Sequence, residues 1–357
     1  MAQGPLRDRL MPLSLVPYTS EWTAGARAFN QRLKGAGAAI DFHLGEEASE
    51  AHYLIVDGEM VRGGCLVDVE RGQVGEEEAG IASIQSPLSE GLFDPQYSGV
   101  SPWLMKEIAR RWPYSYSVGM GGMDRPYPRL LQALRWRVMP APFYFRVLDG
   151  GRVLRSMPAV SHKKGAALLG SVPLLPSLAF RLLHGWKGRR WTGGRVTGLE
   201  RVASFEPGET AAWEAVRRLV TFGVSRESEV LNRRYPPAMK GMSLMRFGGG
   251  FVILKVTQFT DDRHFGSLRV ATWADGLAEP GNENALVSAA EEAAAALKAE
   301  LLITNQLYGP IERAIKSRGW LTHPSNFLVA WSPPLAKVAQ PSTSHITRRD
   351  GDGLVHL

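Results

Sequence analysis

The chain has 357 residues, of which 44% are apolar and 22% charged; this is enough for two globular domains and excludes a largely disordered protein. A single cysteine, Cys65, excludes a disulfide framework, and the N-terminus lacks the apolar core of a secretory signal, so we expect a cytoplasmic protein. The net charge of +7 is concentrated in residues 151–201, which carry +9, whereas residues 1–150 carry −3 and residues 202–357 carry +1.

Helical and strand-like stretches alternate through the first half of the chain. Asp57-Gly58 is a hairpin signal between two strand-like runs. Farther on, a turn that contains Gly99 leads into a helix carrying Trp103 and Ile108. The expected elements are a helix over 21–37, strands over 51–70 and 79–88, a helix that ends at 111, a strand over 114–122, a helix over 127–136 and a strand over 141–148.

Residues 151–201 have the composition of a connector between two folded halves. The 16 uncharged residues between Lys164 and Arg181 are interrupted by prolines, whereas a spanning helix needs roughly 20 unbroken apolar residues, so we expect no membrane crossing here. Basic residues beside Trp186 are typical of a segment that lies at an anionic lipid surface, and peripheral membrane contact therefore stays open beside a solvated linker. No nucleic-acid module accompanies the charge, which argues against nucleic acid as a partner.

The second half repeats the plan of the first. Its Ala-rich segment has the highest helix propensity in the chain, and Asn282 or Asn284 can cap the start of that helix. The expected elements are a helix over 210–223, strands over 242–259 and 264–276, a helix over 284–300, a strand over 301–305, a helix over 310–320 and a strand over 325–332. The sequence thus predicts domains over 1–150 and 202–335, separated by the connector over 151–201, and a C-terminal tail over 336–357.

This order of elements resembles the GNAT superfamily of acyl-CoA N-acyltransferases. The superfamily's pyrophosphate loop has the pattern Gln or Arg, any two residues, Gly, any residue, Gly or Ala. The segment "QYSGVS" over 96–101 matches the first two fixed positions and places a small serine at the third. Two later segments, "LLQALRWRV" and "ERAIKSRGWLT", are similar to the superfamily's later helix, and Gly319-Trp320 keeps its usual ending.

The resemblance covers nearly the whole chain outside the connector. It implies an α/β (α+β) fold with two GNAT-like domains in tandem, each a mixed, mostly antiparallel sheet flanked by helices. The chain resembles in particular the tandem proteins that are encoded among bacterial cell-surface polysaccharide genes. The implied co-substrate is acetyl-CoA or another acyl-CoA. The eight histidines show no metal-ligand spacing, so no metal is expected.

The chemistry of a helix start explains the turn before the first-half helix. Its N–H groups have no internal partner and carry a partial positive charge, which suits a pyrophosphate. A glycine lets the backbone approach the ligand, and Gln96 can donate a side-chain hydrogen bond. An ordinary strand-to-helix turn is the alternative. The candidate CoA-binding residues are Gln96, Tyr97, Ser98, Gly99, Val100 and Ser101.

The corresponding loop of the second half departs from the pattern. Gly281 is present, but Ala278 replaces Gln or Arg, and Glu279 and Glu283 would oppose a phosphate. We therefore expect CoA on the first half and a companion role, in the acceptor groove, for the second. The better-preserved ending at Gly319 is the one feature against this division.

Direct acyl transfer needs an amine that has lost its proton and an acid for the departing thiolate. In the superfamily the acid is often a tyrosine four residues before the glycine of the later helix, but the matching positions here are Leu131 and Ile315. Tyr127 and Tyr308 are the available substitutes, and Glu90, just before the candidate loop, is the best-placed carboxylate for a base. That all three are ordinary packing or surface residues stays open.

The segment "VLNRRYPP" provides the candidate acceptor site and resembles a segment common in the polysaccharide-associated proteins. An arginine pair beside a tyrosine could hold a phosphate or a sugar, while a simple helix end before Pro236 is the alternative. The candidate substrate-binding residues are Asn232, Arg233, Arg234 and Tyr235.

Three functions remain open on the sequence. The leading hypothesis is an acyl-CoA-dependent N-acyltransferase that acts on an amino sugar or similar amine, free or lipid-linked, in cell-envelope polysaccharide biosynthesis. The second is an aminoacyl transferase that resembles the FemAB group and uses aminoacyl-tRNA. The third is a degenerate, non-catalytic binding protein.

Overall fold

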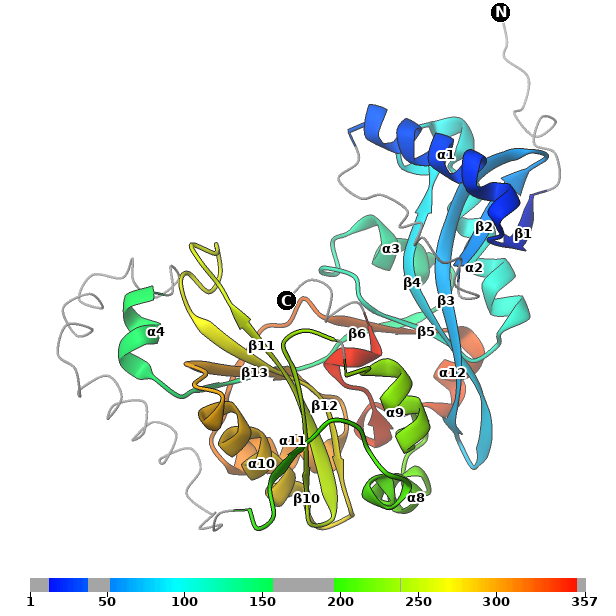
Figure 1. Cartoon of the computed structure of the whole chain (residues 1–357). Helices are drawn as coiled ribbons and strands as arrows, with labels where there is room; N and C mark the ends of the chain where they lie inside the picture. The colour runs from blue at the N-terminus through cyan, green and yellow to red at the C-terminus, as the bar shows by residue number, and fades with distance from the viewer. Residues whose placement is uncertain (1–12, 38–51, 157–195, 238, 352–357) are drawn as a thin grey trace, which may run out of the picture. The chain divides into compact units, whose positions relative to one another are not determined.

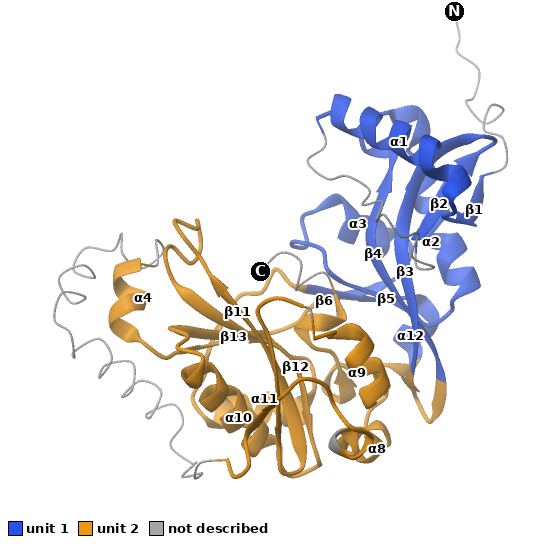
Figure 2. Cartoon of the chain, in the orientation of Figure 1, with its two compact units in different colours: residues 1–71, 79–139, 328–337 blue, residues 72–78, 140–327, 338–357 orange. Residues whose placement is uncertain are grey.

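The computed structural model describes residues 13–37, 52–156, 196–237 and 239–351, and the chain divides into two compact units (Figure 2). Unit 1 comprises Met1–Arg71, Ala79–Met139 and Leu328–Lys337, and unit 2 comprises Gly72–Glu78, Pro140–Phe327 and Val338–Leu357. Each unit therefore takes segments from both halves of the sequence.

Unit 1 is built on a mixed sheet in the order β1-β2-β3-β4-β5-β15-β6 (Figure 1). The pairs β1 with β2, β2 with β3 and β5 with β15 are antiparallel, whereas β4 and β5 are parallel. The strands are β1 Ser14–Pro17, β2 His52–Asp57, β3 Met60–Val74, β4 Glu77–Ser89, β5 Ser115–Gly119, β6 Arg137–Pro140 and β15 Leu328–Trp331, and the longer helices are α1 Thr23–Gly35, α2 Val100–Arg111 and α3 Pro126–Ala133.

The contacts of β2 show that the helices of unit 1 cover both faces of the sheet. Leu54 packs in one cluster with Phe29 of α1, whereas its neighbour Ile55 packs in another with Leu104 and Ile108 of α2. Successive residues of a strand point to opposite faces, so α1 and α2 lie on opposite sides of the sheet. Helix α2 follows β4 after a loop over 90–99.

Unit 2 repeats the architecture with a sheet in the order β14-β7-β13-β12-β11-β10-β8. Only β12 and β13 pair in parallel among these strands. The strands are β7 Phe143–Val147, β8 Glu200–Val202, β10 Met242–Phe247, β11 Gly250–Gln258, β12 Arg269–Ala278, β13 Leu301–Asn305 and β14 Leu321–His323, with a short ladder of β9 Phe222–Val224 and β16 Ser344–His345. The helices are α4 Gly150–Ser156, α8 Ala212–Arg217, α9 Ser228–Arg234, α10 Glu283–Ala296 and α11 Gly309–Ser317, and α12 Pro333–Val338 follows β15.

Two strands lie elsewhere than the sequence suggested. β7, expected to complete the first half, pairs with β13 in unit 2, and β15, expected to complete the second half, pairs with β5 in unit 1. A local apolar pattern indicates that a segment is a strand but carries no information about which distant strand it joins. The chain therefore exchanges the last strand of each half.

The ends of the expected connector lie in regular structure. Helix α4 and strand β8 belong to unit 2, and residues 157–195 lie outside the described part of the chain. None of the helices in the described ranges is long and apolar enough to cross a membrane. The expected membrane contact of the connector stays a prediction.

Candidate functional site

The parallel pairing of β4 with β5 ends several residues before β4 does, and both strands then lead into glycine-containing loops. Their parallel ladder consists of Ala82 opposite Ser115 and Ser83 opposite Tyr116. One residue farther, the hydroxyl of Ser117 donates to the carbonyl of Ile84 at 2.9 Å in place of a backbone bond. Beyond this point β4 continues to Ser89 without a ladder partner on β5. Main-chain groups of β4 are thereby left for another partner.

The loop after β4 consists of two short 3₁₀ turns, Glu90–Leu92 and Pro95–Tyr97, which lead into α2. The Asp94 carboxylate accepts a hydrogen bond from the Gln96 N–H at 3.0 Å and caps the second turn. The backbone passes so close to Gly91 that a β-carbon there would lie 2.6 Å from the Tyr97 carbonyl oxygen. The loop conformation is therefore fixed by its own contacts.

Gly99 caps the start of α2 and faces open space. Its φ of −74° and ψ of −16° suit any residue, and a β-carbon built on it would meet nothing within 4 Å. The glycine is thus not required by the backbone conformation of the turn. The first turn of α2 offers N–H groups without intrahelical acceptors, and Pro102 in that turn has none to offer. The space over Gly99 would allow an anion to approach the start of α2.

The six candidate loop residues divide between the surface and the core. Val100 is fully buried beneath α2, and the Ser101 hydroxyl lies 2.6 Å from that of Ser89 at the end of β4. The side chains of Gln96 and Ser98 are exposed, like Gly99. The C-terminal end of the loop is therefore packed into unit 1, whereas its middle is exposed to solvent.

Glu90 occupies a different environment from the one its position suggested. It is 2% exposed, and its two carboxylate oxygens accept hydrogen bonds from Arg32 Nε at 2.5 Å and Arg62 Nη1 at 2.8 Å. The Arg62 guanidinium in turn lies 4.3 Å from the centre of the Tyr97 ring. Both oxygens of this carboxylate are engaged by guanidiniums, so its contacts favour a role in positioning the loop.

Sequence reasoning missed the two arginines of this cluster. Arg32 lies on α1 and Arg62 on β3, and neither forms part of a recognisable motif. The only available signal was that both are cations on otherwise apolar element faces.

Tyr127 packs within unit 1. Its hydroxyl donates to Met105 Sδ at 3.8 Å, and Leu131, at the position of the expected acid, is fully buried. The catalytic role of Tyr127 stays a prediction.

In the second-half loop, a glutamate carboxylate lies at the start of the helix. The Glu283 carboxylate at the start of α10 accepts the N–H of Gly281 at 3.1 to 3.2 Å, in a turn where Gly281 has φ +94°. The position that a phosphate would take at this helix start is therefore next to an internal carboxylate. This geometry supports the assignment of CoA to the first-half loop.

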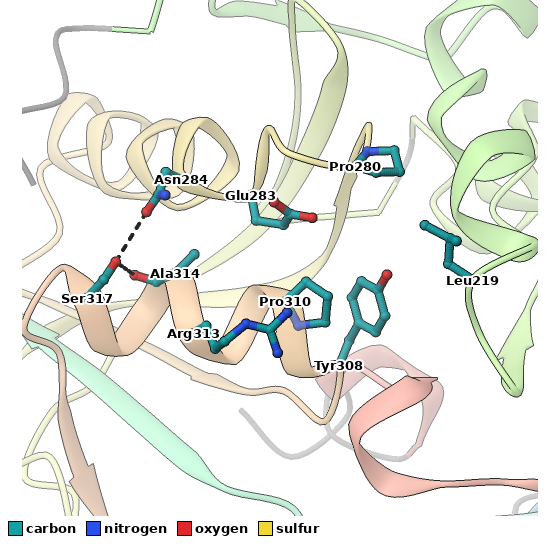
Figure 3. A pocket seen from close by; sticks show the side chains of 9 residues that line it. All are labelled: Leu219, Pro280, Glu283, Asn284, Tyr308, Pro310, Arg313, Ala314 and Ser317. Carbon is teal, nitrogen blue, oxygen red and sulfur yellow. Dashed lines mark hydrogen bonds between the residues drawn. The ribbon is translucent and has the colours of Figure 1, made fainter.

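Unit 2 nevertheless contains a pocket of about 320 Å³ between the starts of α10 and α11 (Figure 3). Tyr308, which precedes α11, lines it with Glu283 and Arg313. Tyr308 is 4% exposed, and burial together with the nearby Glu283 raises the pKa of its phenol. Sequence reasoning singled out Tyr308 as a substitute acid, and the structure places it on unit 2, in this pocket.

The candidate acceptor segment forms the end of α9, which stops at Arg234 before Pro236 as the simpler interpretation predicted. Asn232 exchanges two hydrogen bonds with the backbone of Phe205, both 2.8 Å long, and Arg233 is exposed. The Tyr235 hydroxyl donates to Asp275 at 3.2 Å inside the unit. These polar groups are used within the protein, and their role toward a substrate stays a prediction.

Arg234 belongs to a buried charge network that the sequence did not reveal. Arg226, which is fully buried, donates to Asp350 Oδ2 at 2.5 Å and lies 3.4 Å from Asp275 Oδ1, and Arg234 lies 3.3 Å from Asp350 Oδ1. Burial opposes the charge on Arg226, but the two carboxylates raise its pKa overall. Residue 350, in the expected tail, is therefore part of the interior of unit 2.

Burial of His345 beside this network, and the Arg226 cation, lower the pKa of its imidazole to about 4. Its Nε2 lies 3.2 Å from the Gly276 carbonyl oxygen, which fits a neutral ring that donates this proton. No cluster of three or more metal-ligating side chains occurs in the part of the chain that the structure describes.

No protein-family model and no curated protein matches the chain. Among solved structures, it is similar to a GCN5-related N-acetyltransferase from Anabaena variabilis, with a TM-score of 0.51 and 10% identity over 94% of this chain and 84% of that one. It is also similar to a conserved protein from Enterococcus faecalis described as a probable N-acyltransferase, with a TM-score of 0.51 and 10% identity over 90% of this chain and 73% of that one. The likeness shows the fold: the expected class, two mixed, mostly antiparallel sheets flanked by helices, is confirmed.

Proposed function

We propose that the protein is an acyl-CoA-dependent N-acyltransferase and that unit 1 binds the CoA pyrophosphate at the start of α2. The observation that carries the proposal is the open space over Gly99, at a helix start whose first N–H groups have no intrahelical acceptor. A glycine that neither the backbone nor its neighbours require is best explained by a ligand that passes over it.

The stability of the loop supports this proposal. Asp94, the Ser89–Ser101 hydroxyl pair and the Arg62–Tyr97 contact hold the loop through interactions within the protein. A binding loop that is already ordered loses little conformational entropy when it binds.

The separation of β4 from β5 supports the placement of the rest of the cofactor. CoA carries an arm with two amide groups, which can pair with strand main-chain groups as an added strand would. The stretch of β4 from Gln85 to Ser89, which has no ladder partner on β5, provides such groups next to the α2 loop. The thioester would then lie at the edge where the two strands diverge.

The proposed step is direct transfer. The acceptor nitrogen attacks the thioester carbonyl, a C–N bond forms, the C–S bond breaks, and the nitrogen loses a proton as CoA leaves as its thiol. Tyr127 is the proposed acid on unit 1. An amino sugar or similar amine is the proposed acceptor, and cell-envelope polysaccharide synthesis is the proposed process. The proposed acceptor-binding residues are Asn232, Arg233, Arg234 and Tyr235. Residues 151–201 are proposed to make peripheral membrane contact.

Calorimetric titration of the full chain with CoA and acetyl-CoA tests the proposal. Gly99→Glu should abolish binding because it places bulk and negative charge over the helix start, whereas Gly99→Ala should keep the fold and weaken binding far less, because its methyl group has room. Both variants should melt within a few degrees of the parent. Equal CoA affinity of Gly99→Glu and the parent would exclude this site.

Thiol release from acetyl-CoA in the presence of amino sugars then tests the transfer itself. Activity that depends on the amine and is lost in Gly99→Glu is the expected result. CoA binding without transfer to any amine would leave a binding protein and contradict the enzymatic part of the proposal.

A further inference from the structure

The pocket of unit 2 contains two opposite charges that do not neutralise each other. Glu283 stands on the α10 side and Arg313 on the α11 side (Figure 3). Within the described ranges neither residue forms an ion pair, with the other or with any further residue, although both line one cavity of about 320 Å³. Unpaired charges that share a small cavity leave complementary positions for a ligand.

Tyr308 adds a hydrogen-bond donor to the same cavity. Its side chain is 4% exposed, and its hydroxyl makes no hydrogen bond with the described residues. Figure 3 shows this hydroxyl directed into the space between Glu283 and Leu219. A hydroxyl that has no partner within the protein can donate to a ligand without first breaking a protein hydrogen bond.

The size and remaining surface of the pocket limit what can bind. Its volume lies at the lower end of the range for small-molecule sites, and Leu219, Pro280 and Pro310 provide apolar contacts between the polar groups. Glu283 excludes a multiply charged phosphate from the helix start by repulsion. A short molecule with one charge of each sign meets all of these conditions.

We infer that the pocket between α10 and α11 of unit 2 is a binding site for a small zwitterion, with its ammonium at Glu283 and its carboxylate at Arg313 and Tyr308. The site requires only residues of unit 2. It is independent of the CoA proposal, because none of these side chains belongs to the loop of unit 1.

Titration of the full chain with a graded panel tests the inference. The probes are the straight-chain ω-amino carboxylates from β-alanine to 6-aminohexanoate, each with the carboxylate and the amine of the same length. At least one zwitterion should bind about tenfold more tightly than both of its singly charged counterparts, because each lost charge leaves a charged pocket group unpaired. Absence of binding across the panel, or equal binding of the singly charged analogues, would overturn the inference.

Three variants assign the contacts. Arg313→Gln and Glu283→Gln should each weaken the best zwitterion about tenfold, whereas Lys316→Gln, which removes an exposed cation of α11 outside the pocket, should not. Tyr308→Phe should weaken binding with no loss of thermal stability, because the hydroxyl makes no bond within the protein. If Arg313→Gln behaves like Lys316→Gln, the assigned carboxylate position is wrong.

Discussion

The guanidinium of Arg62 lies over the ring of Tyr97, with its central carbon 4.3 Å from the ring centre. Arg62 comes from β3 and Tyr97 from the turn before α2, so the contact links the sheet of unit 1 to the candidate CoA loop. Glu90 fixes the arginine through its Oε2 oxygen and holds Arg32 through the other. This chain of contacts makes the loop geometry depend on side chains that do not reach the open face of Gly99.

Glu90→Gln should weaken CoA binding about threefold to tenfold, because the amide holds only one of the two arginines as an acceptor. The acid limb of the pH profile of kcat/KM should remain, because both oxygens of Glu90 are already engaged by arginines. Glu90→Asp should restore part of the affinity. Glu107→Gln, which weakens the ion pairs with Arg110 and Arg111 within α2, is the matched control and should leave CoA affinity unchanged. Loss of the acid limb in Glu90→Gln would show that Glu90 is the base after all.

Tyr97→Leu should weaken CoA binding about twofold to tenfold, the range expected for a lost cation–π contact of about 0.5 to 1.5 kcal/mol. Tyr97→Phe keeps the ring and should bind CoA like the parent. Calorimetry on the two variants separates the ring from the hydroxyl. A larger loss in Tyr97→Phe than in Tyr97→Leu would show that the hydroxyl contacts the ligand and that the stacking is incidental.

Local sequence carried much of the architecture because each element has a local physical signature. The helix over α10, the glycine turn before α2 and the hairpin at Asp57-Gly58 could all be predicted from propensity and turn chemistry. The exchange of β7 and β15 could not, because pairing partners lie far apart in sequence. The ion pairs of Glu90 escaped prediction for the same reason: Arg32 lies 58 residues upstream.

The buried His345 predicts an acid-sensitive unit 2. Its pKa is lowered to about 4 from an ordinary value of 6.5, so the unfolded chain binds the extra proton first and stability is lost as the pH falls from about 6.5 to 4. Full loss corresponds to about 3 kcal/mol. Arg226, Asp275, Asp350 and the ring of Tyr308 face the imidazole.

Replacement by His345→Gln tests this expectation, since glutamine can donate to the Gly276 carbonyl but does not titrate. The decrease in melting temperature between pH 7 and pH 4.5 should be smaller in the variant than in the parent. An equal decrease in both proteins would assign the acid sensitivity to other groups. Asp350 titrates below this pH range: burial raises its pKa, but Arg226 and Arg234 lower it to about 2.

The ion pair between Arg226 and Asp350 should contribute far more to folding than the exposed pair between Arg246 and Glu200. The side chains of the first pair are 0% and 1% exposed, and those of the second are 43% and 60% exposed. Removing one partner of a buried pair leaves an uncompensated charge in the interior and costs about 3 to 5 kcal/mol, whereas an exposed pair contributes about 0 to 1 kcal/mol. Asp350→Asn should therefore lower the free energy of unfolding of unit 2 several times more than Glu200→Gln, as measured by urea denaturation at pH 7.

Because Asp350 also pairs with Arg234, a further Arg234→Met change on the Asp350→Asn background should recover part of the lost stability by removing one of the two unpaired buried cations. Equal stability of Asp350→Asn and Glu200→Gln would mean that the segment containing Asp350 is not packed into unit 2 in solution.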